Sequence, residues 1–491
     1  MGIGRYGCIE WMDFARVPRE VSMSRASLTH PLITLAFCGA LLAGCQSHDI
    51  DFSPEPLAMA GAVYSIPSPQ VPAAGQAWWE AFGDSKLDAL IHQALDRNYD
   101  VMQAVARLRQ AASLTRQAQA SRYPQLGLEL ALRREWRESG EDDRQNLVGG
   151  ALAWEIDAFN RLGSSALARQ SEQAARLEDV ETVRLSLSAE VAEAYFDAVE
   201  QRNQLALLRS QIATDRELLE LTQLRFDSGL TASVDVWQQS SQLAETESIV
   251  PPVEAILRFS ENRLDVLLGQ APDAVDRVAD TDRFAGIGDL PFLGVPSDLL
   301  LNRPDLRALR NELVAADAEI GQAIAERLPR LILNGSLLHQ DGPELSGPVA
   351  LVLGSLVQPL IDWGARKAEV ERNRALYVER LALFSQAYLE AVESVENALY
   401  QERKQLEFLH RLERRRGFLE RTVTETRDRY TNGLTDFLPV LAATKELQQL
   451  ERILLRQQRD LLAYRIRLHR ALGGSVGSSW AEAAGSSGGL E

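Results

Sequence analysis

Side chains that could carry covalent or metal chemistry are few in this 491-residue chain. It holds six histidines and three cysteines, and no stretch matches a phosphate-binding loop, a His-Glu-x-x-His zinc motif or a Gly-x-Ser-x-Gly nucleophile motif. His92, His410 and His469 fall in predicted helices, and His339 lies beside a predicted turn. Because no nucleophile has a base beside it, we expect these histidines to be structural or solvated. The sequence therefore predicts a protein that is not an enzyme and that uses no cofactor and no metal.

One cysteine does lie in an informative context. Leu42-Ala43-Gly44-Cys45 ends a short apolar run that begins at Leu32 and follows a cationic start at Arg25. The pattern is typical of a secretory signal peptide, and its last four residues resemble a bacterial lipobox, whose cysteine is acylated, with palmitate for example, and becomes the first mature residue. The alternative is a chance cysteine at an ordinary cleavage site. We expect residues 1–44 to be a leader, with 1–22 a misassigned start, and Cys45 to carry the lipid.

Charge and hydropathy narrow the class of protein further. The chain has 52 basic and 69 acidic residues, a net charge of −17, which argues against a nucleic-acid partner. The longest apolar candidate after the leader, Pro348 to Ile361, is too short for a membrane helix and contains Gly354 and Pro359. Any membrane crossing therefore has to use strands.

The sequence contains an internal repeat. Tyr123-Pro124-Gln125-Leu126 is followed 205 residues later by Leu328-Pro329-Arg330-Leu331. Arg225-Phe226-Asp227-Ser228-Gly229-Leu230-Thr231 is followed 204 residues later by Arg429-Tyr430-Thr431-Asn432-Gly433-Leu434-Thr435. The offset is far longer than a solenoid repeat, so it indicates a duplicated unit of domain size.

Each unit shows the same order of elements. A helix is predicted first, over Leu87 to Ala120 and over Pro304 to Arg327, then a pair of strands, then a long helical hairpin closed by a glycine turn. The predicted partition is as follows: 45–82, a lipidated extended segment; 83–270, the first repeat, with strands in 122–157 and a hairpin in 160–269; 271–303, a linker; 304–473, the second repeat, with strands in 328–362 and a hairpin in 364–472; 474–491, a disordered tail.

The strand segments alternate in hydropathy. Leu126, Leu128, Leu130 and Leu132 are separated by small or polar residues, as expected when one face of a strand meets an apolar medium. Two strands per repeat give four per chain. Four strands cannot close a barrel, and open edges are not tolerated in lipid, so we expect strands to be pooled between chains.

The long helices carry heptad patterns that are typical of coiled coils. Steps of seven from Leu177 to Phe226 are apolar at seven of eight positions, whereas the companion series is mixed, since it includes Gln201, Asp215 and Thr222. We therefore predict one strong apolar seam and a second, partly wet one. A helix of about 65 residues would be on the order of 100 Å long.

One segment between the repeats is distinctive. Val295-Pro296-Ser297-Asp298-Leu299-Leu300-Leu301-Asn302-Arg303-Pro304-Asp305-Leu306-Arg307, followed by Ala315-Ala316-Asp317-Ala318-Glu319-Ile320-Gly321, resembles the signature of the outer-membrane efflux channels of tripartite pumps, the TolC-like family, in its lipoprotein branch. Trp154-Glu155-Ile156-Asp157 and the turn at 429–435 add to the resemblance, which covers about 45 to 473.

The resemblance implies a mixed α and β membrane protein. It implies a homotrimer whose twelve pooled strands form one transmembrane β-barrel, continuous with a periplasmic α-helical barrel. It also implies a passive conduit in the outer membrane, anchored there by lipid, with a periplasmic adaptor protein and an inner-membrane transporter as partners.

A lipidated periplasmic adaptor of an efflux system is the alternative. Such a protein should have one helical hairpin flanked by β-rich halves, whereas this sequence predicts two tandem hairpins, each with its own strand pair. The channel is therefore the favoured interpretation.

The two turns are the expected docking end of such a channel. The adaptor-contact tip that we predict consists of Gly229, Leu230, Thr231, Gly433, Leu434 and Thr435. Glycine is explained by the end of a helix alone, but exposed leucines at a hairpin tip are not.

Just beyond the second turn, the sequence differs from the family that it resembles. Where the resemblance leads us to expect aspartates beyond the second turn, the chain has Pro439 and Ala442, and only Asp235 and Asp436 lie nearby. We expect Asp235 and Asp436 to form what acidic constriction exists, because threefold symmetry would make each a ring of carboxylates. The alternative for Asp436 is a cap on the returning helix.

Overall fold

The computed structural model describes residues 48–61, 63–66, 77–136, 142–273, 275–278, 284–341 and 346–474. The predicted leader, the lipidation residue Cys45 and the tail from 475 onward lie outside these residues. Residues 48–491 are assigned to one compact unit.

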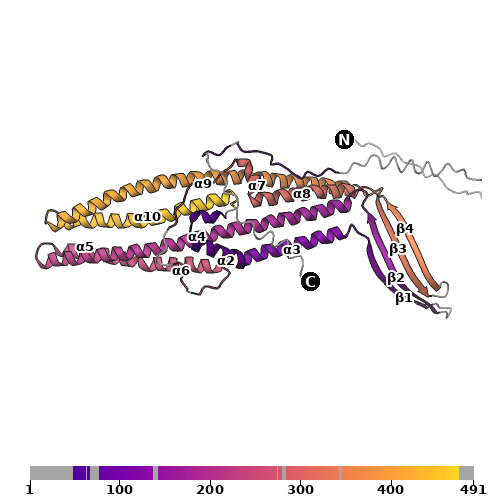
Figure 1. Ribbon diagram of the computed structural model, residues 1–491, viewed down its shortest axis with the longest axis horizontal. Helices are drawn as coiled ribbons and strands as arrows, with labels where there is room; N and C mark the ends of the chain where they lie inside the picture. Colours follow the sequence, from indigo (N-terminus) through magenta and orange to yellow (C-terminus); the bar gives the residue numbers. More distant parts are fainter. Residues whose placement is uncertain are drawn as a thin grey trace, which may run out of the picture. The chain divides into compact units, whose positions relative to one another are not determined.

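Both predicted strand pairs are present and join in one antiparallel sheet. The strands are β1 (Gln125–Trp136), β2 (Asp142–Ile156), β3 (Arg330–Asp341) and β4 (Ser346–Val357), in the order β1-β2-β3-β4. The central pairing of β2 with β3 brings the two repeats together, and β1 and β4 are the outer strands. In Figure 1 the sheet lies at one end of the helices and the two hairpin tips lie at the other.

The first helix of each repeat differs from its partner. In the second repeat a single helix, α8 (Pro304–Ala325), occupies the predicted place. In the first repeat the predicted helix is two helices, α2 (Ser85–Arg97) and α3 (Tyr99–Ala120), preceded by the short turn η1 (Trp78–Phe82). The break lies at Asn98, which is extended, caps α3 through the backbone N–H of Asp100 and donates to the carbonyl of Leu267.

The long helices have the predicted length. The helices α4 (Arg161–Asp227) and α9 (Ala365–Thr431) have 67 residues each. At 1.5 Å per residue each is about 100 Å long. The return helix of the second repeat, α10 (Phe437–Ala471), is continuous.

The return helix of the first repeat is interrupted. It consists of α5 (Ser233–Ser248) and α6 (Val250–Leu267), which meet at Ile249. Pro251 and Pro252 follow at once, and each proline lacks an N–H and crowds the preceding turn, which accounts for the break.

The structure shows which of the two heptad series of α4 is buried within the chain. All seven residues of the companion series are buried in the chain, including its polar members Gln201, Asp215 and Thr222. The apolar series from Leu177 to Phe226 is buried only in its middle, and both of its end residues are exposed. Asp215 accepts hydrogen bonds from two other helices, whereas Gln201 and Thr222 donate to acceptors within α4, and these bonds make the polar positions compatible with burial.

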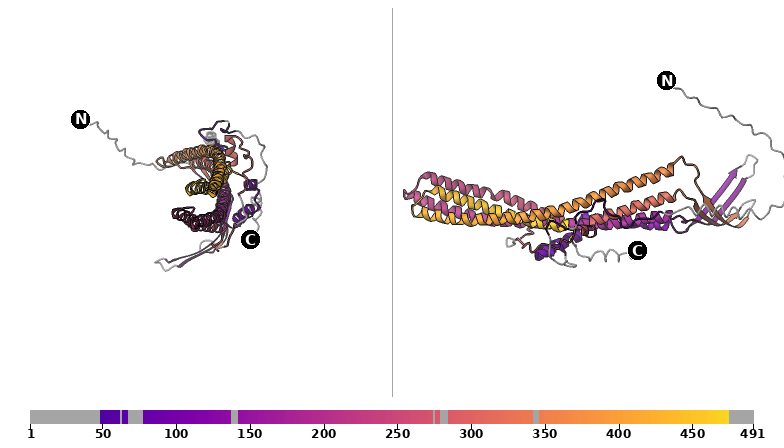
Figure 2. Two further views of the ribbon diagram at one scale, coloured as in Figure 1. Left: turned by 90° about the vertical axis from the view of Figure 1, so that its left-hand side faces the viewer. Right: turned by 90° about the horizontal axis from the view of Figure 1, so that it is seen from above.

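The two hairpins lie side by side, as the views in Figure 2 and the contacts of α10 with α4 agree. Between the repeats the chain forms η2 (Pro296–Asp298) and α7 (Leu299–Asn302). Arg303 fixes this segment, because its guanidinium pairs with Asp305 and donates to the carbonyl of Ala471. Among the residues that the structure describes, none of the helices has the length and hydropathy of a membrane span.

Candidate functional site

The sheet has two chemically different faces. Paired residues of an antiparallel sheet share a face. Leu126, Leu152 and Val352 therefore lie on one face, together with Gly335, which pairs with both Leu152 and Val352. Gln125, Ala153 and Asn334 lie together on the other face. The predicted strand is present, and its four alternating leucines lie on one face and are largely exposed in the chain.

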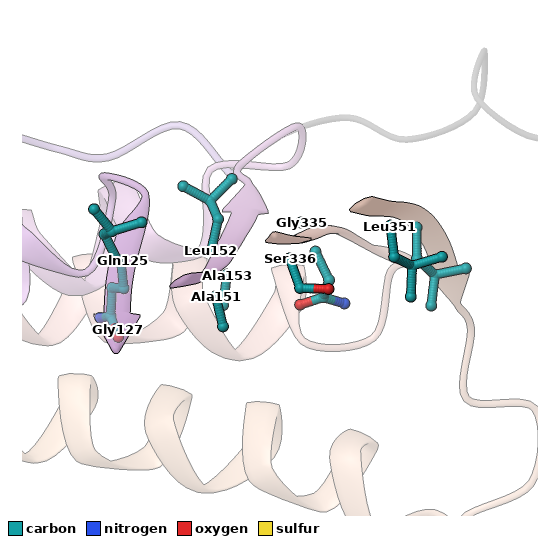
Figure 3. A pocket seen from close by; sticks show the side chains of 11 residues that line it. Gln125, Gly127, Ala151, Leu152, Ala153, Gly335, Ser336 and Leu351 are labelled. Atoms are coloured by element: carbon teal, nitrogen blue, oxygen red, sulfur yellow. The ribbon is translucent and has the colours of Figure 1, made fainter. Parts of the chain in front are cut away.

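The second face is lined mainly by small and polar residues near the helical end of the strands. Figure 3 shows a hollow there that takes Gly127, Ala151 and Ser336 from three successive strands, with Leu351 from the fourth. One face of the sheet is therefore apolar, whereas the other is small and polar on β1 to β3 near the helices and carries Leu351 and Leu353 on β4.

The hairpin tips have matching backbone geometry. Gly229 and Gly433 have φ values of +68° and +71°, the left-handed conformation that glycine tolerates. The N–H of Leu230 donates to the carbonyl of Arg225 at 2.8 Å, and that of Leu434 donates to Arg429 at the same distance. Both turns are therefore Schellman caps, which end a long helix and reverse the chain.

The tip leucines are exposed. Leu230 is 65% exposed and Leu434 is 67% exposed, while Thr231 and Thr435 are half-buried. Three further apolar residues close to the turns are also largely exposed in the chain, and the sequence prediction missed them: Val234, Trp237 and Leu438. These residues lie in the first two turns of the return helices. The sequence analysis counted heptads mainly along the long helices and did not consider apolar residues at this place.

The two aspartates near the tips have different surroundings. Asp235, in the first turn of α5, accepts a hydrogen bond from the Thr231 hydroxyl. Asp436 stands at the N-cap position of α10 with extended backbone, but its exposed carboxylate accepts no capping hydrogen bond. Asp436 is therefore the less restrained of the two.

A buried polar cluster lies between the two hairpins. Asp215 on α4 has no exposed surface and accepts from Thr246 on α5 at 2.7 Å and from Gln448 on α10 at 2.8 Å. Gln242 on α5 donates to Gln448 at 3.2 Å. The cluster thus joins three helices from both repeats through hydrogen bonds, and sequence reasoning missed it.

His469 and His92 have structural surroundings, and His339 and His410 are exposed. His469 packs on the ring of Trp78, and burial, with the nearby charge of Arg465, lowers its pKa to about 4. His92 contacts the carbonyl of Asp88, one turn earlier in α2. In the described part of the chain no group of three or more histidines, cysteines or carboxylates is placed to hold a metal.

The segment that follows Cys45 lies against the second repeat. His48 bonds Asp317 on α8 at 2.6 Å, and the N–H of Asp51 donates to the same carboxylate at 2.8 Å. Further along, the N–H of Ser65 donates to Glu396 on α9 at 2.8 Å. The segment is therefore held by side-chain acceptors rather than by a sheet.

Comparisons with known proteins agree with this geometry. A family model described as "Outer membrane efflux protein" matches residues 90–270 and 295–474, one match in each repeat. The "Pyoverdine export outer membrane protein OpmQ" of Pseudomonas putida is 30% identical over 426 residues, covering 81% of this chain and 88% of that protein. "Nodulation protein T" of Rhizobium leguminosarum bv. trifolii is 26% identical over 419 residues, covering 82% and 88%.

Solved structures share the fold. The outer-membrane channel OprN superposes with a TM-score of 0.78 at 27% identity, covering 86% of this chain and 99% of the channel. The MtrE outer membrane channel of Neisseria gonorrhoeae gives a TM-score of 0.78 at 22% identity, covering 87% and 98%.

The family model is named for efflux, and OpmQ and OprN are named as an export protein and a channel, so the adaptor alternative has no support among them. The structure also departs from that alternative, since it has two tandem hairpins and one sheet shared by both repeats. The chain belongs to the outer membrane efflux protein family.

Proposed function

We propose that this chain is the outer-membrane conduit of a tripartite efflux pump and that three copies build it. The observation that carries the proposal is a four-stranded sheet with one apolar face, two outer strands and helices of about 100 Å attached to it. In lipid the unpaired edges of β1 and β4 are costly, so each must pair with another copy. Twelve pooled strands would close one barrel.

Three copies would supply twelve strands, enough for a barrel with an open lumen. Eight strands enclose a space that side chains fill, whereas wider barrels leave a water-filled lumen. Native mass measurement in detergent should give a trimer, and the protein should conduct ions across a planar bilayer. A stable monomer that conducts would contradict the proposal.

We further propose that Cys45 carries a lipid. His48, three residues on, is bound to Asp317, which lies eight residues before the end of α8. Three extended residues reach about 11 Å, and eight helical residues span about 12 Å. Fully extended toward the sheet, these three residues would span most of the distance from Asp317 to the end of α8, which lies five residues before β3 begins. Mass spectrometry should find an acylated Cys45 as the first residue; an unmodified different residue would contradict it.

The hairpin tips are the proposed contact with a periplasmic adaptor, which in turn would connect to an inner-membrane transporter. The contact consists of the two Gly-Leu-Thr turns at 229–231 and 433–435, and the exposed Trp237 beside them supports an apolar contact. Leu230→Glu with Leu434→Glu should abolish efflux while the trimer remains intact. Thr424→Glu, on an exposed face of α9, is the matched control. Normal efflux in the double variant would remove the tip from the contact.

Asp235 and Asp436 are the proposed acidic constriction. The free carboxylate of Asp436 supports a ring rather than a cap, because it accepts no capping hydrogen bond. Asp436→Asn should then lower the cation selectivity of single channels without a loss of thermal stability. A fall in stability with unchanged selectivity would identify a cap instead.

A further inference from the structure

Near the tips, the two hairpins of one chain are joined by an arginine on an aromatic ring. The Arg225 guanidinium in the last turn of α4 lies 4.5 Å from the ring centroid of Tyr430 on α9. The same guanidinium donates to the carbonyl of Thr431 at 3.3 Å. Tyr430 is buried, together with Leu218, Phe437 and Val440.

The duplication supplies a second set of the same residues. At the tips the two repeats are offset by 204 residues, so Arg429 corresponds to Arg225 and Phe226 corresponds to Tyr430. In the described part of the chain, the Arg429 guanidinium is exposed and makes no hydrogen bond or ion pair, and the Phe226 ring is 40% exposed. One chain thus completes one contact and leaves the parts of an equivalent contact unused.

The helices that form the contact within a chain determine which helices can form the equivalent contact between chains. Within a chain, the tip of the second hairpin packs against α4 of the first. In a ring of alternating hairpins, the tip of the first hairpin must then pack against α9 of the next copy. We propose that Arg429 of one copy lies on Phe226 of another copy, so that a cation–π contact joins neighbouring chains. This inference rests on the proposed trimer.

The flanking residues support the proposal by their chemistry. Asp227 corresponds to Thr431, so the arginine would meet a backbone carbonyl and a carboxylate there. Thr422 and Ser233 stand where Leu218 and Phe437 stand in the contact within the chain, so less apolar surface is available between copies. The arginine contact therefore contributes a larger share of the contact between copies than Arg225 does within one.

Cysteine cross-linking tests the pairing, since the mature chain contains no cysteine beyond Cys45. Phe226→Cys and Arg429→Cys are placed in two chains with different tags, which are co-expressed and treated with a short bismaleimide. A denaturing gel should show a shift to bands that carry both tags. The matched control, Arg225→Cys and Tyr430→Cys in separate chains, should give no such band, whereas the two changes in one chain should link internally.

Two outcomes separate the proposals. A trimer by native mass without a doubly tagged band overturns the pairing of Arg429 with Phe226 and leaves the channel proposal intact. A monomer by native mass overturns the trimer itself.

Discussion

The two repeats bury acidic side chains and basic side chains at the same positions of their return helices. Glu261 and Asp265 on α6 correspond, 204 residues later, to Arg465 and His469 on α10. All four residues are buried. The duplication has therefore kept two inward-facing titratable positions, with a cation in place of one carboxylate and a histidine of lowered pKa in place of the other.

In the second repeat the buried charge is a cation with many acceptors. Arg465 forms two hydrogen bonds with the carboxylate of Glu402 on α9, at 2.6 and 2.8 Å. It also donates to the carbonyls of Ile287 and Asp289, in the segment between the repeats. The guanidinium is thus satisfied on both sides.

In the first repeat the buried charges are acidic. Glu261 accepts from Arg202 on α4 at 3.0 Å, and Arg202 also pairs with Asp276. Asp265 accepts from Arg277 at 2.6 Å. Asp276 and Arg277 belong to the same segment between the repeats.

We infer that the segment between the repeats determines which charge is buried at the helix positions that it contacts. Carbonyl oxygens at 287 and 289 require a donor, whereas the guanidinium of Arg277 requires an acceptor. Equivalent helix positions therefore carry whichever charge the crossing chain can satisfy.

Removing the cation should have the largest effect. Arg465→Leu leaves the Glu402 carboxylate buried without its partner, and we expect a loss of about 3–5 kcal/mol in the free energy of unfolding. Glu261→Leu should cost less, because Arg202 keeps Asp276. Chemical unfolding followed by circular dichroism in detergent measures both. Equal losses in the two variants would contradict the proposed difference between the repeats. Glu402→Leu added to Arg465→Leu should recover part of the loss.

The next largest effect should be a loss of stability at acidic pH that arises from His469 in the second repeat. The pKa of His469 is lowered to about 4, so the unfolded chain binds this proton more readily than the folded chain. The burial of neutral His469 has no pH-dependent cost well above pH 6.5. The free energy of unfolding should fall by about 3 kcal/mol as the pH drops from there toward 4. His469→Phe should remove this dependence while keeping the contact with Trp78. An unchanged pH profile in His469→Phe would contradict the assignment.

A smaller effect is expected at Asp215, whose counterpart in the second repeat is Leu419. Asp215→Leu leaves Thr246 and Gln448 without their acceptor, which should cost about 1–3 kcal/mol. Glu217→Leu, on the exposed side of α4, is the control and should change stability little. Thermal unfolding of both variants tests whether the buried polar cluster stabilises the chain.

The smallest effect should be the same in both repeats. Gly229→Ala and Gly433→Ala place a side chain in a left-handed conformation but meet no atom within 4 Å, so only backbone strain opposes them. We expect each to cost about 1 kcal/mol. Losses that differ between the two tips in thermal unfolding would show that the turns are not equivalent.

Sequence patterns succeeded where the signal was local. The alternating leucines of β1 and the two tip glycines were identified correctly, because strand period and helix termination depend on neighbouring residues. The interruption at Ile249 also had a local signal, the pair Pro251-Pro252, which the prediction of one continuous return helix overlooked.

Burial of polar residues could not be predicted in this way. Asp215 was taken for part of a wet seam, but its partners Thr246 and Gln448 are 31 and 233 residues away. The acidic side chains on α6 and their basic counterparts on α10 were missed for the same reason. Hydropathy describes a residue alone, whereas the free energy of burying it depends on partners that only the fold brings close.

The pairing of β2 with β3 has a consequence for the order of folding. Ile156 and Leu331 are paired across the sheet although 175 residues separate them. Closing so long a flexible loop costs roughly 4–5 kcal/mol of chain entropy, whereas the turn between β1 and β2 closes locally. A preformed first hairpin shortens the effective loop, so we expect the helices to acquire protection in pulsed hydrogen exchange before β3 does. β3 and β4 would then join the first strand pair last, on a scaffold of helices that is already folded.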